Sequence, residues 1–275
     1  ALAETPVKTP APKDRRVIGV GPNGYLYADD VEAQQRDMTV TSALCAIADA
    51  QGDVDAFIAL HDEDSRRVPA FAADIGRRLL DADRPAEALT TVNNAKSSRA
   101  PLYTGELDAI RVEALDQLGR QEDAQQHRWA RFAKDLDAEY LQAYLRRLPD
   151  FDDLDVEEQA LVHVEQHPNI HAALSFLVNW RAHARAARVV LVRRNELNGN
   201  LFTVLTPAAN TLAEAHPLAA TVLLRTMIDF CLEVGKTTRY RHAGRHLDEC
   251  AQLAERIPDF GDLDDHASYL AQLKA

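Results

Sequence analysis

The strongest evidence for the fold comes from two similar stretches, "RRLLDADRPAEAL" (Arg77–Leu89) and "VEALDQLGRQEDAQ" (Val112–Gln125). Each consists of an apolar helix end, a short turn that contains an arginine, and an acidic helix start. The second stretch follows the first after about 36 residues, a spacing typical of repeated helix pairs. Ala88 and Ala124 occupy matching places in the two helix starts, where a small side chain lets two helices approach closely.

The two stretches resemble the tetratricopeptide unit of paired antiparallel helices. The chain keeps a helical texture from about Val31 onward, and its plentiful alanine, leucine and arginine favour helices. We therefore predict an all-α fold, a tetratricopeptide-like α-solenoid of antiparallel helix pairs over residues 31–275, with a sub-boundary near residues 149–155. Residues 1–30 are rich in proline and glycine and are expected to form an extended N-terminal linker or arm.

A second repetition, "RLPDFDDLD" (Arg147–Asp155) and "RIPDFGDLD" (Arg256–Asp264), is interpreted as a connection between helices. In the first copy Pro149 is expected to end one helix, because proline cannot continue it. Asp155 and Glu158 are expected to form a capping box that starts the next helix. The phrase thus predicts a helix end followed by a helix start.

The same phrase fails as a calcium loop, which needs alternating acidic ligands, a glycine at its sixth position and a bidentate acid at its twelfth. Counted from Asp150, the fifth, sixth and twelfth positions are Leu154, Asp155 and Leu161. The second copy has Gly261 in place of an aspartate. The pattern therefore favours an architectural role over a calcium site.

The glycine cluster "GVGPNG" (Gly19–Gly24) matches the letters of a dinucleotide-binding fingerprint. Such a site needs a helix that opens on the last glycine. Here Pro22 and Asn23 favour a turn, and "YLYADD" after Gly24 looks extended. We therefore predict a turn in place of a dinucleotide site.

The composition narrows the classes of function. A formal net charge of −12 disfavours a wide nucleic-acid surface, which needs a basic excess. Cys45, Cys231 and Cys250 are scattered without a C-x-x-C, which argues against a disulfide framework and a thiolate zinc site and favours a reducing, cytoplasmic location. No run of about 18 apolar residues occurs, so no membrane span is predicted.

Residues 217–233, "PLAATVLLRTMIDFCLE", are predicted to form the most buried helix. The segment starts with a proline at a first helical position and is apolar nearly all round. Arg225 and Asp229 lie four residues apart within it. A buried pair of charges needs further partners, so it either fixes the helix register or marks a polar site within a groove.

The stretch "HVEQHPNIH" places His163 and His167 four residues apart on one helix face, where two histidines can hold zinc with Glu158 or Glu165 alongside. The catalytic H-E-x-x-H pattern is missing, because Val164 follows His163. We favour histidines at a helix C-terminus that satisfy backbone carbonyls, and we keep a metal site as the alternative.

The densest basic stretch is "KTTRYRHAGRH" (Lys236–His246). Arg241 and Arg245 point away from the apolar stripe of this predicted helix and are expected in solvent. His242 and His246 repeat the four-residue spacing and have a similarly weak claim to a metal.

A second basic stripe is expected from Arg181, Arg185 and Arg188, spaced like one face of a helix. Trp180 and Tyr240 are the aromatic residues next to the two stripes. Converging faces of this kind could receive an anionic partner, since arginine and large aromatics are enriched at binding hot spots. The alternative is that these arginines pair with neighbouring acidic residues in solvent.

Five long phrases of the chain, "IADAQGDVDAFIA", "LRRLPDFDDLDVEEQAL", "HAALSFLVNW", "LTPAANTLAEAHPLAATVLLRTMIDF" and "RYRHAGRHL", resemble an uncharacterised proteobacterial family of helical-repeat proteins. The resemblance covers most of the chain from about Lys13 onward. It implies no assigned activity and no catalytic residues, and it implies a further helical half before the linker, so the chain is expected to be a fragment or a short member. Some relatives are linked with SWIM-type zinc fingers, but the ligands of such a finger are missing here.

We expect a non-enzymatic scaffold or adaptor that binds a protein or peptide in a concave groove without a cofactor. The first alternative is a metal-binding regulator or metal-dependent enzyme that uses His163 and His167. The second is an adaptor in a nucleic-acid-associated complex that uses the arginine stripes. No nucleophile or phosphate-loop motif supports an enzyme.

Overall fold

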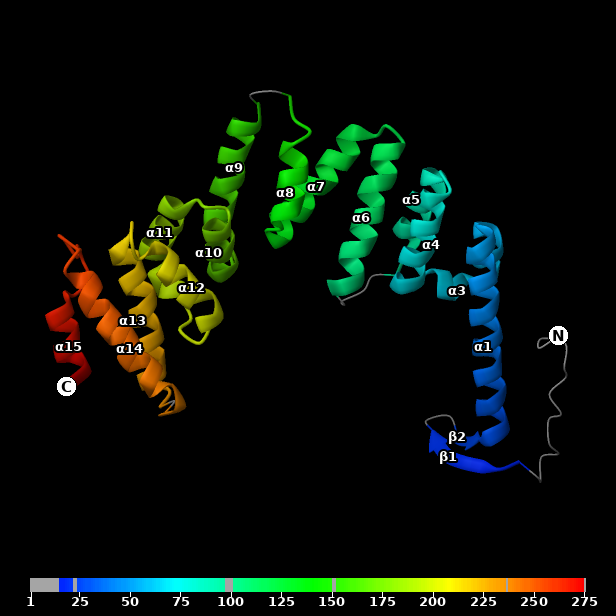
Figure 1. The fold of residues 1–275 in the computed structure, drawn as a ribbon, viewed down its shortest axis with the longest axis horizontal. Coiled ribbons are helices and arrows are strands. Elements are labelled where there is room, and N and C mark those ends of the chain that lie inside the picture. The colour runs from blue at the N-terminus through cyan, green and yellow to red at the C-terminus, as the bar shows by residue number, and fades with distance from the viewer. Residues whose placement is uncertain (1–14, 22–23, 97–100, 150–151, 236, 275) are drawn as a thin grey trace. The chain divides into compact units, whose positions relative to one another are not determined.

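The computed structural model describes residues 15–21, 24–96, 101–149, 152–235 and 237–274. These ranges are mostly helical, with one small two-stranded sheet, which confirms the predicted all-α class (Figure 1). The chain divides into two compact units, Ala1–Gln125 and Gln126–Ala275, and each has a hydrophobic core of its own. The sub-boundary predicted near residues 149–155 falls inside the second unit.

The first unit begins with a hairpin where the sequence predicts an extended arm. Its antiparallel strands β1 (Val17–Gly21) and β2 (Gly24–Tyr27) are rich in β-branched and aromatic residues, which suit strands. The helix α1 (Ala28–Gln51) follows β2 directly, so the last glycine of the cluster opens a strand and not a helix. Residues 1–14 and the turn expected at Pro22 and Asn23 lie outside the described residues.

The remaining helices of the first unit follow in short succession. They are α2 (Val54–Ala59), α3 (Glu63–Arg66), α4 (Pro69–Asp81), α5 (Pro85–Asn94), α6 (Pro101–Gln117) and the start of α7 (Gln121–Asp135), which continues into the second unit. The helices α4, α5 and α6 pack side by side (Figure 1). Ala88 and Ala124 are fully buried, as expected of residues where helices approach closely.

One turn geometry joins helices at several places. A residue with positive φ ends the helix, and the next amide donates a hydrogen bond to the carbonyl five residues earlier, as in a Schellman turn. In the first of the two similar stretches, Asp83 has φ 57° and Arg84 N–H bonds Leu79 O at 2.8 Å. In the second, Gly119 has φ 70° and Arg120 N–H bonds Leu115 O at 2.9 Å.

The same geometry occurs at Gly52 and at Arg181, with φ values of 66° and 64°. The amides of Asp53 and Ala182 donate the corresponding bonds, each 2.9 Å long, to Ala48 and Leu177. In the two similar stretches this turn coincides with the short connection predicted from their shared letters. The turns at Gly52 and Arg181 have the same geometry without those letters.

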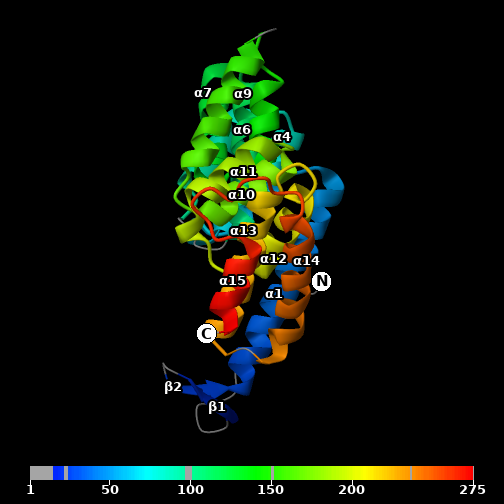
Figure 2. The same ribbon diagram turned by 90° about the vertical axis from the view of Figure 1, so that its left-hand side faces the viewer.

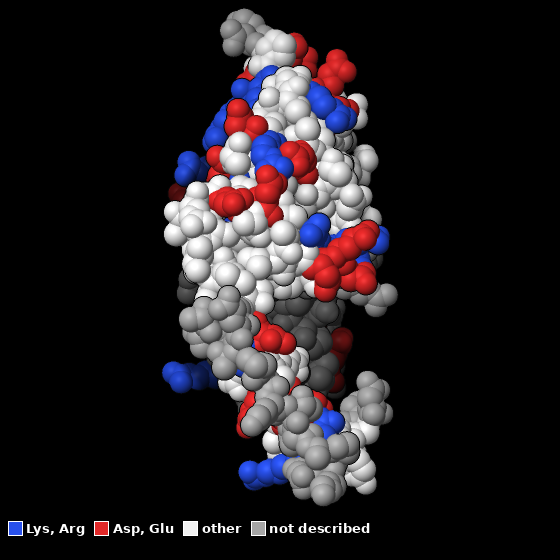
Figure 3. All heavy atoms as spheres, turned by 90° about the vertical axis from the view of Figure 1, so that its right-hand side faces the viewer, with Lys and Arg blue, Asp and Glu red and all other residues white. Residues whose placement is uncertain are grey.

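Intermixed charges cover part of the surface. On the face shown in Figure 3, acidic and basic side chains stand next to one another. Arg78 illustrates the pairing in the first unit, because its guanidinium contacts Asp49 at 2.6 Å and Asp74 at 2.8 Å. Exposed pairs of this kind contribute little stability, but they neutralise the charge of the arginine.

The second unit is entirely helical in its described residues. It contains the rest of α7, then α8 (Ala138–Leu145), α9 (Asp152–Gln166), α10 (Ile170–Asn179), α11 (His183–Val192), the 3₁₀ turn η2 (Arg194–Glu196), α12 (Phe202–Leu212), α13 (Pro217–Glu233), the 3₁₀ turn η3 (Thr237–Arg239), α14 (Tyr240–Ala254) and α15 (His266–Lys274). The helices α12, α13 and α14 lie side by side (Figure 2). The sequence predicted α13 with its observed bounds and its deep burial.

Both copies of the repeated phrase join two helices, but the following helix starts differently in each. In the first, α8 ends before Pro149 and α9 already begins at Asp152, so the predicted capping box of Asp155 and Glu158 is wrong. Asp155 lies in the first turn of the helix, where a negative charge is still favourable. Directly after the second copy, Asp265 caps α15 by accepting the amide hydrogen of Ser268 at 2.7 Å.

No helix in the described part of the chain is long and apolar enough to cross a membrane.

Candidate functional site

The predicted stripe of three arginines does not form. Arg181 occupies the left-handed turn before α11 and therefore does not continue its face. Arg185 and Arg188 do lie on α11, and both bind Glu165, at 2.9 Å and 2.6 Å respectively. Arg185 also pairs with Glu158. These two arginines therefore follow the alternative, in which neighbouring carboxylates neutralise them.

Trp180 belongs to the packing of the second unit. Its ring stacks on Phe176 with the centroids 5.3 Å apart, and its indole nitrogen donates a hydrogen bond of 2.6 Å to Glu157. Both ends of this side chain are therefore engaged within the chain.

His163 of α9 and His167, directly after that helix, both contact the backbone. His163 Nε2 lies 2.9 Å from the carbonyl oxygen of Ala133, in α7, and His167 Nδ1 accepts the amide hydrogen of Asn169 at 3.2 Å. Glu165, which could complete a metal site, is held by two arginines. Within the described ranges, no three histidine, cysteine or acidic residues gather as metal ligands would.

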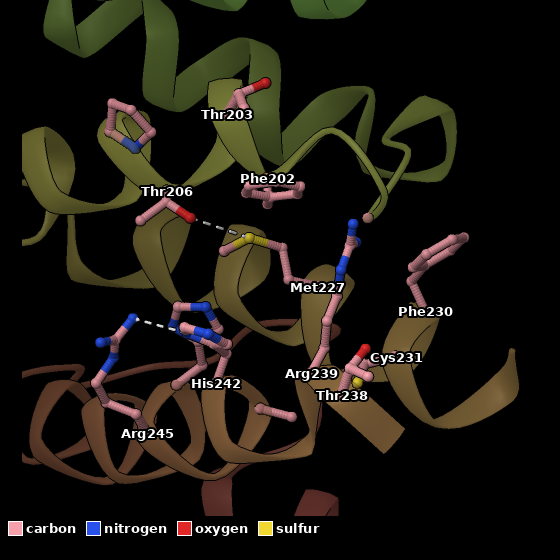
Figure 4. A pocket seen from close by; sticks show the side chains of 14 residues that line it. Phe202, Thr203, Thr206, Met227, Phe230, Cys231, Thr238, Arg239, His242 and Arg245 are labelled. Carbon is pink, nitrogen blue, oxygen red and sulfur yellow. Dashed lines mark hydrogen bonds between the residues drawn. The ribbon is translucent and has the colours of Figure 1, made fainter. Parts of the chain in front are cut away.

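A cavity of about 490 Å³ lies between α12, α13 and α14 (Figure 4). Its wall is largely apolar and includes Phe202 of α12 together with Met227 and Phe230 of α13. The hydroxyl of Thr206 contacts the sulfur of Met227 at 3.4 Å, which fixes the methionine against the neighbouring helix. This volume is in the range of pockets that hold small ligands or single side chains.

Gly199 allows the pocket to form. A Cβ atom at this position would lie 2.2 Å from the carbonyl oxygen of Thr226 and 2.5 Å from Cβ of Phe230. Only glycine therefore lets the loop before α12 run directly against α13. This contact places Phe202, the first residue of α12, at the wall of the cavity.

Four basic or titratable side chains border the cavity: Arg239, His242, Arg245 and His246. Arg239 donates a hydrogen bond of 3.1 Å to Asn200 Oδ1, and its guanidinium lies 4.5 Å from the centre of the Phe202 ring. None of the described residues that line the cavity is acidic.

The partners of the other three residues lie on the same helix. Arg245 Nη2 approaches His242 Nδ1 at 3.4 Å, as the dashed line in Figure 4 marks, and its Nε is 3.6 Å from Glu249. The buried His246 contacts the same Glu249 at 3.2 Å. The side chain of Arg245 remains 60% exposed, so it is free to meet a ligand.

The pocket contains part of the predicted binding set. Arg245 of that set lines it, whereas Arg241 and Tyr240 lie on α14 without lining it. His242 and His246, considered in the sequence only as weak metal candidates, also line it. Sequence reasoning missed Arg239 and Phe202 as site residues.

Two residues in the sequence do indicate this region. They are an isolated glycine at 199 and a proline at 207 inside a helical pattern.

Comparison with known families identifies a family to which no function is assigned. A family of unknown function, DUF6880, matches residues 1–275. The chain belongs to the DUF6880 family. No curated protein and no solved structure matches this DUF6880 chain. In this DUF6880 protein the pocket between α12, α13 and α14 is therefore described from its own geometry and not from a similar protein.

Proposed function

We propose that this DUF6880 chain is a non-enzymatic interaction module that binds a segment of a partner protein in the pocket between α12, α13 and α14. One observation carries the proposal. The cavity combines an apolar wall of Phe202, Met227 and Phe230 with a basic border that includes Arg239 and Arg245. Aromatic residues, methionine and arginine are the residue types enriched at protein interfaces.

The architecture that we propose around the pocket is a tetratricopeptide-like solenoid. The Schellman turns at Gly52, Asp83, Gly119 and Arg181 support it, because each joins two consecutive helices in the same way. Stacked helix pairs expose extended surfaces that bind proteins or peptides. We also propose that the chain is a cytoplasmic protein of a proteobacterium, as its free cysteines and its phrase resemblance favour.

Site-specific photo-crosslinking in the native host tests the proposal. The photoreactive amino acid p-benzoylphenylalanine replaces Phe202 at the pocket, and in a control it replaces Val192, which is 78% exposed at the end of α11. We expect a protein adduct from position 202 and none of the same mass from position 192.

A blocking variant makes the test specific. Thr203 is exposed and lines the cavity, so Thr203→Trp places an indole ring at the pocket without disturbing the core. Thr211→Trp is the matched control, since Thr211 is exposed on the same helix and does not line the cavity. The adduct should disappear with T203W and persist with T211W. Equal adducts from positions 202 and 192, or an adduct that survives T203W, would refute the proposed function.

A further inference from the structure

The first observation behind a more specific inference is the local charge of the pocket. The whole chain has 43 acidic residues against 31 lysines and arginines. Nevertheless, the described residues of the cavity wall include two arginines and two histidines, and none of them is an aspartate or glutamate. An apolar space with a basic border in an acidic protein is complementary to a ligand that is apolar and negatively charged.

The second observation is the state of Arg239. Its contacts are with neutral groups, namely the amide oxygen of Asn200 and the ring of Phe202. No carboxylate in the described ranges pairs with it, unlike Arg193 and Arg194, which bind Glu196 and Asp262. A guanidinium has five N–H donors, so most of those of Arg239 remain available for a carboxylate, which arginine binds in a bidentate manner.

The third observation is that Arg239 is already oriented. The hydrogen bond to Asn200 and the contact with Phe202 hold the guanidinium beside the apolar wall. Holding a long side chain in its binding position lowers the entropy that binding costs. A carboxylate on Arg239 would place the group next to it over Phe202 and Met227, within the cavity (Figure 4).

We infer that the occupant of the pocket is an acidic peptide segment of a partner protein, in which an apolar anchor side chain fills the cavity and a neighbouring carboxylate binds Arg239. The inference rests on the proposed function and adds the chemistry of the partner. Arg245, exposed on the same border, keeps donors available beyond its 3.6 Å contact with Glu249 and can meet an acidic residue farther along the segment.

An array of synthetic peptides measures this preference directly. Each ten-residue peptide has one phenylalanine, leucine or tryptophan anchor in a Gly/Ser background, flanked by glutamate, glutamine or lysine. We expect the glutamate peptides to bind at least about tenfold more tightly than the glutamine peptides, and the lysine peptides to bind least, because a charge-assisted pair contributes more than about 1.4 kcal/mol. The difference should shrink as the salt concentration rises.

Variants of single arginines identify which arginine binds the acidic residue of the peptide. Arg239→Gln should weaken the binding of the glutamate peptides to the level of the glutamine peptides. Arg239→Lys should restore part of the difference in affinity between the two sets of peptides. Arg241→Gln is the matched control, since Arg241 is exposed on α14 and does not line the cavity. Thermal unfolding of each variant verifies that it folds.

Each other outcome would overturn the inference. Equal binding of glutamate and glutamine peptides, or no binding of any acidic peptide, would show that the occupant is not an acidic segment. Binding of decanoate in place of the peptides would indicate a small carboxylic acid. The photo-crosslink from position 202 reports on partner binding independently of charge, so the proposed function can stand when this inference fails.

Discussion

The hydroxyl of Tyr269 donates a hydrogen bond of 2.6 Å to Oδ1 of Asp229 and so joins the last helix, α15, to the most buried helix, α13. Arg225 reinforces the junction. Its guanidinium lies 4.3 Å from the centre of the Tyr269 ring, and its Nη1 donates a hydrogen bond of 2.7 Å to the carbonyl of Asp264. The two charged residues of α13 therefore anchor the C-terminal segment of the chain through separate contacts.

Removing the hydroxyl of Tyr269 should destabilise the protein. In Tyr269→Phe the ring still packs, but Asp229 loses a hydrogen bond in a largely buried place. We expect the free energy of unfolding in urea to fall by about 1–3 kcal/mol. The control is Tyr240→Phe. The side chain of Tyr240 is exposed, so removal of its hydroxyl should change the free energy of unfolding by less than about 0.5 kcal/mol.

Asp229 should make stability depend on pH in an unusual direction. Burial, with a further contribution from Glu233, raises its pKa above the ordinary 3.8, although Tyr269 and Arg225 oppose the shift. Its contribution to stability is therefore complete below pH 3.8 and is lost as the pH rises through the raised pKa of the folded chain. Asp229→Asn resembles the protonated form, so its stability relative to the wild type should increase across this window and then remain constant.

Urea unfolding between about pH 2 and pH 8 measures the difference at about half-unit intervals. Asp262→Asn is the control with the opposite sign, because the nearby Arg194 lowers the pKa of Asp262. The stability that Asp262 contributes is present above pH 3.8 and is lost as the pH falls through its lowered pKa. Parallel curves for the two variants would contradict the prediction.

Gly199→Ala should disrupt the contact between the loop before α12 and α13. The added Cβ would overlap the carbonyl oxygen of Thr226, which is backbone and cannot turn aside. We expect a loss of about 2 kcal/mol or more in thermal unfolding. Gly244→Ala is the comparison, since Gly244 lies exposed in α14 with open space around it and alanine should stabilise the helix by about 0.5–1 kcal/mol.

The three cysteines should differ in reactivity. Cys250 is fully buried, and burial raises the pKa of its thiol to about 12, so almost none of it is thiolate at neutral pH. Cys231 is also buried, whereas Cys45 is partly exposed. Ellman's reagent should modify Cys45 first in the folded protein and all three thiols in urea. Rapid modification that persists in Cys45→Ser would contradict this assignment.

Local signals in the sequence predicted several elements correctly. Pro217 fixes the start of α13, because proline suits the first turn of a helix. Aspartate favours the N-cap position, and Asp53 and Asp137 each accept an amide hydrogen from the first turn of the helix that follows. These signals depend on neighbours in the sequence, so they need no knowledge of the tertiary structure.

The errors arose where one residue changed the direction of the chain. A positive φ at a non-glycine residue has no reliable signature, so Arg181 was placed on a helix face although it forms a turn. The pocket was missed for a related reason. Phe202, Met227 and Arg239 come from separate segments, and only the packing of three helices brings them together.

The lack of a side chain at position 199 gives a criterion for comparing members of DUF6880. A relative with alanine or a larger residue there must move the backbone carbonyl that corresponds to Thr226, and the loop before α12 must stand farther from α13. The residue at this position of an alignment would thereby separate family members whose pocket accepts the same ligand from members whose pocket accepts a different one.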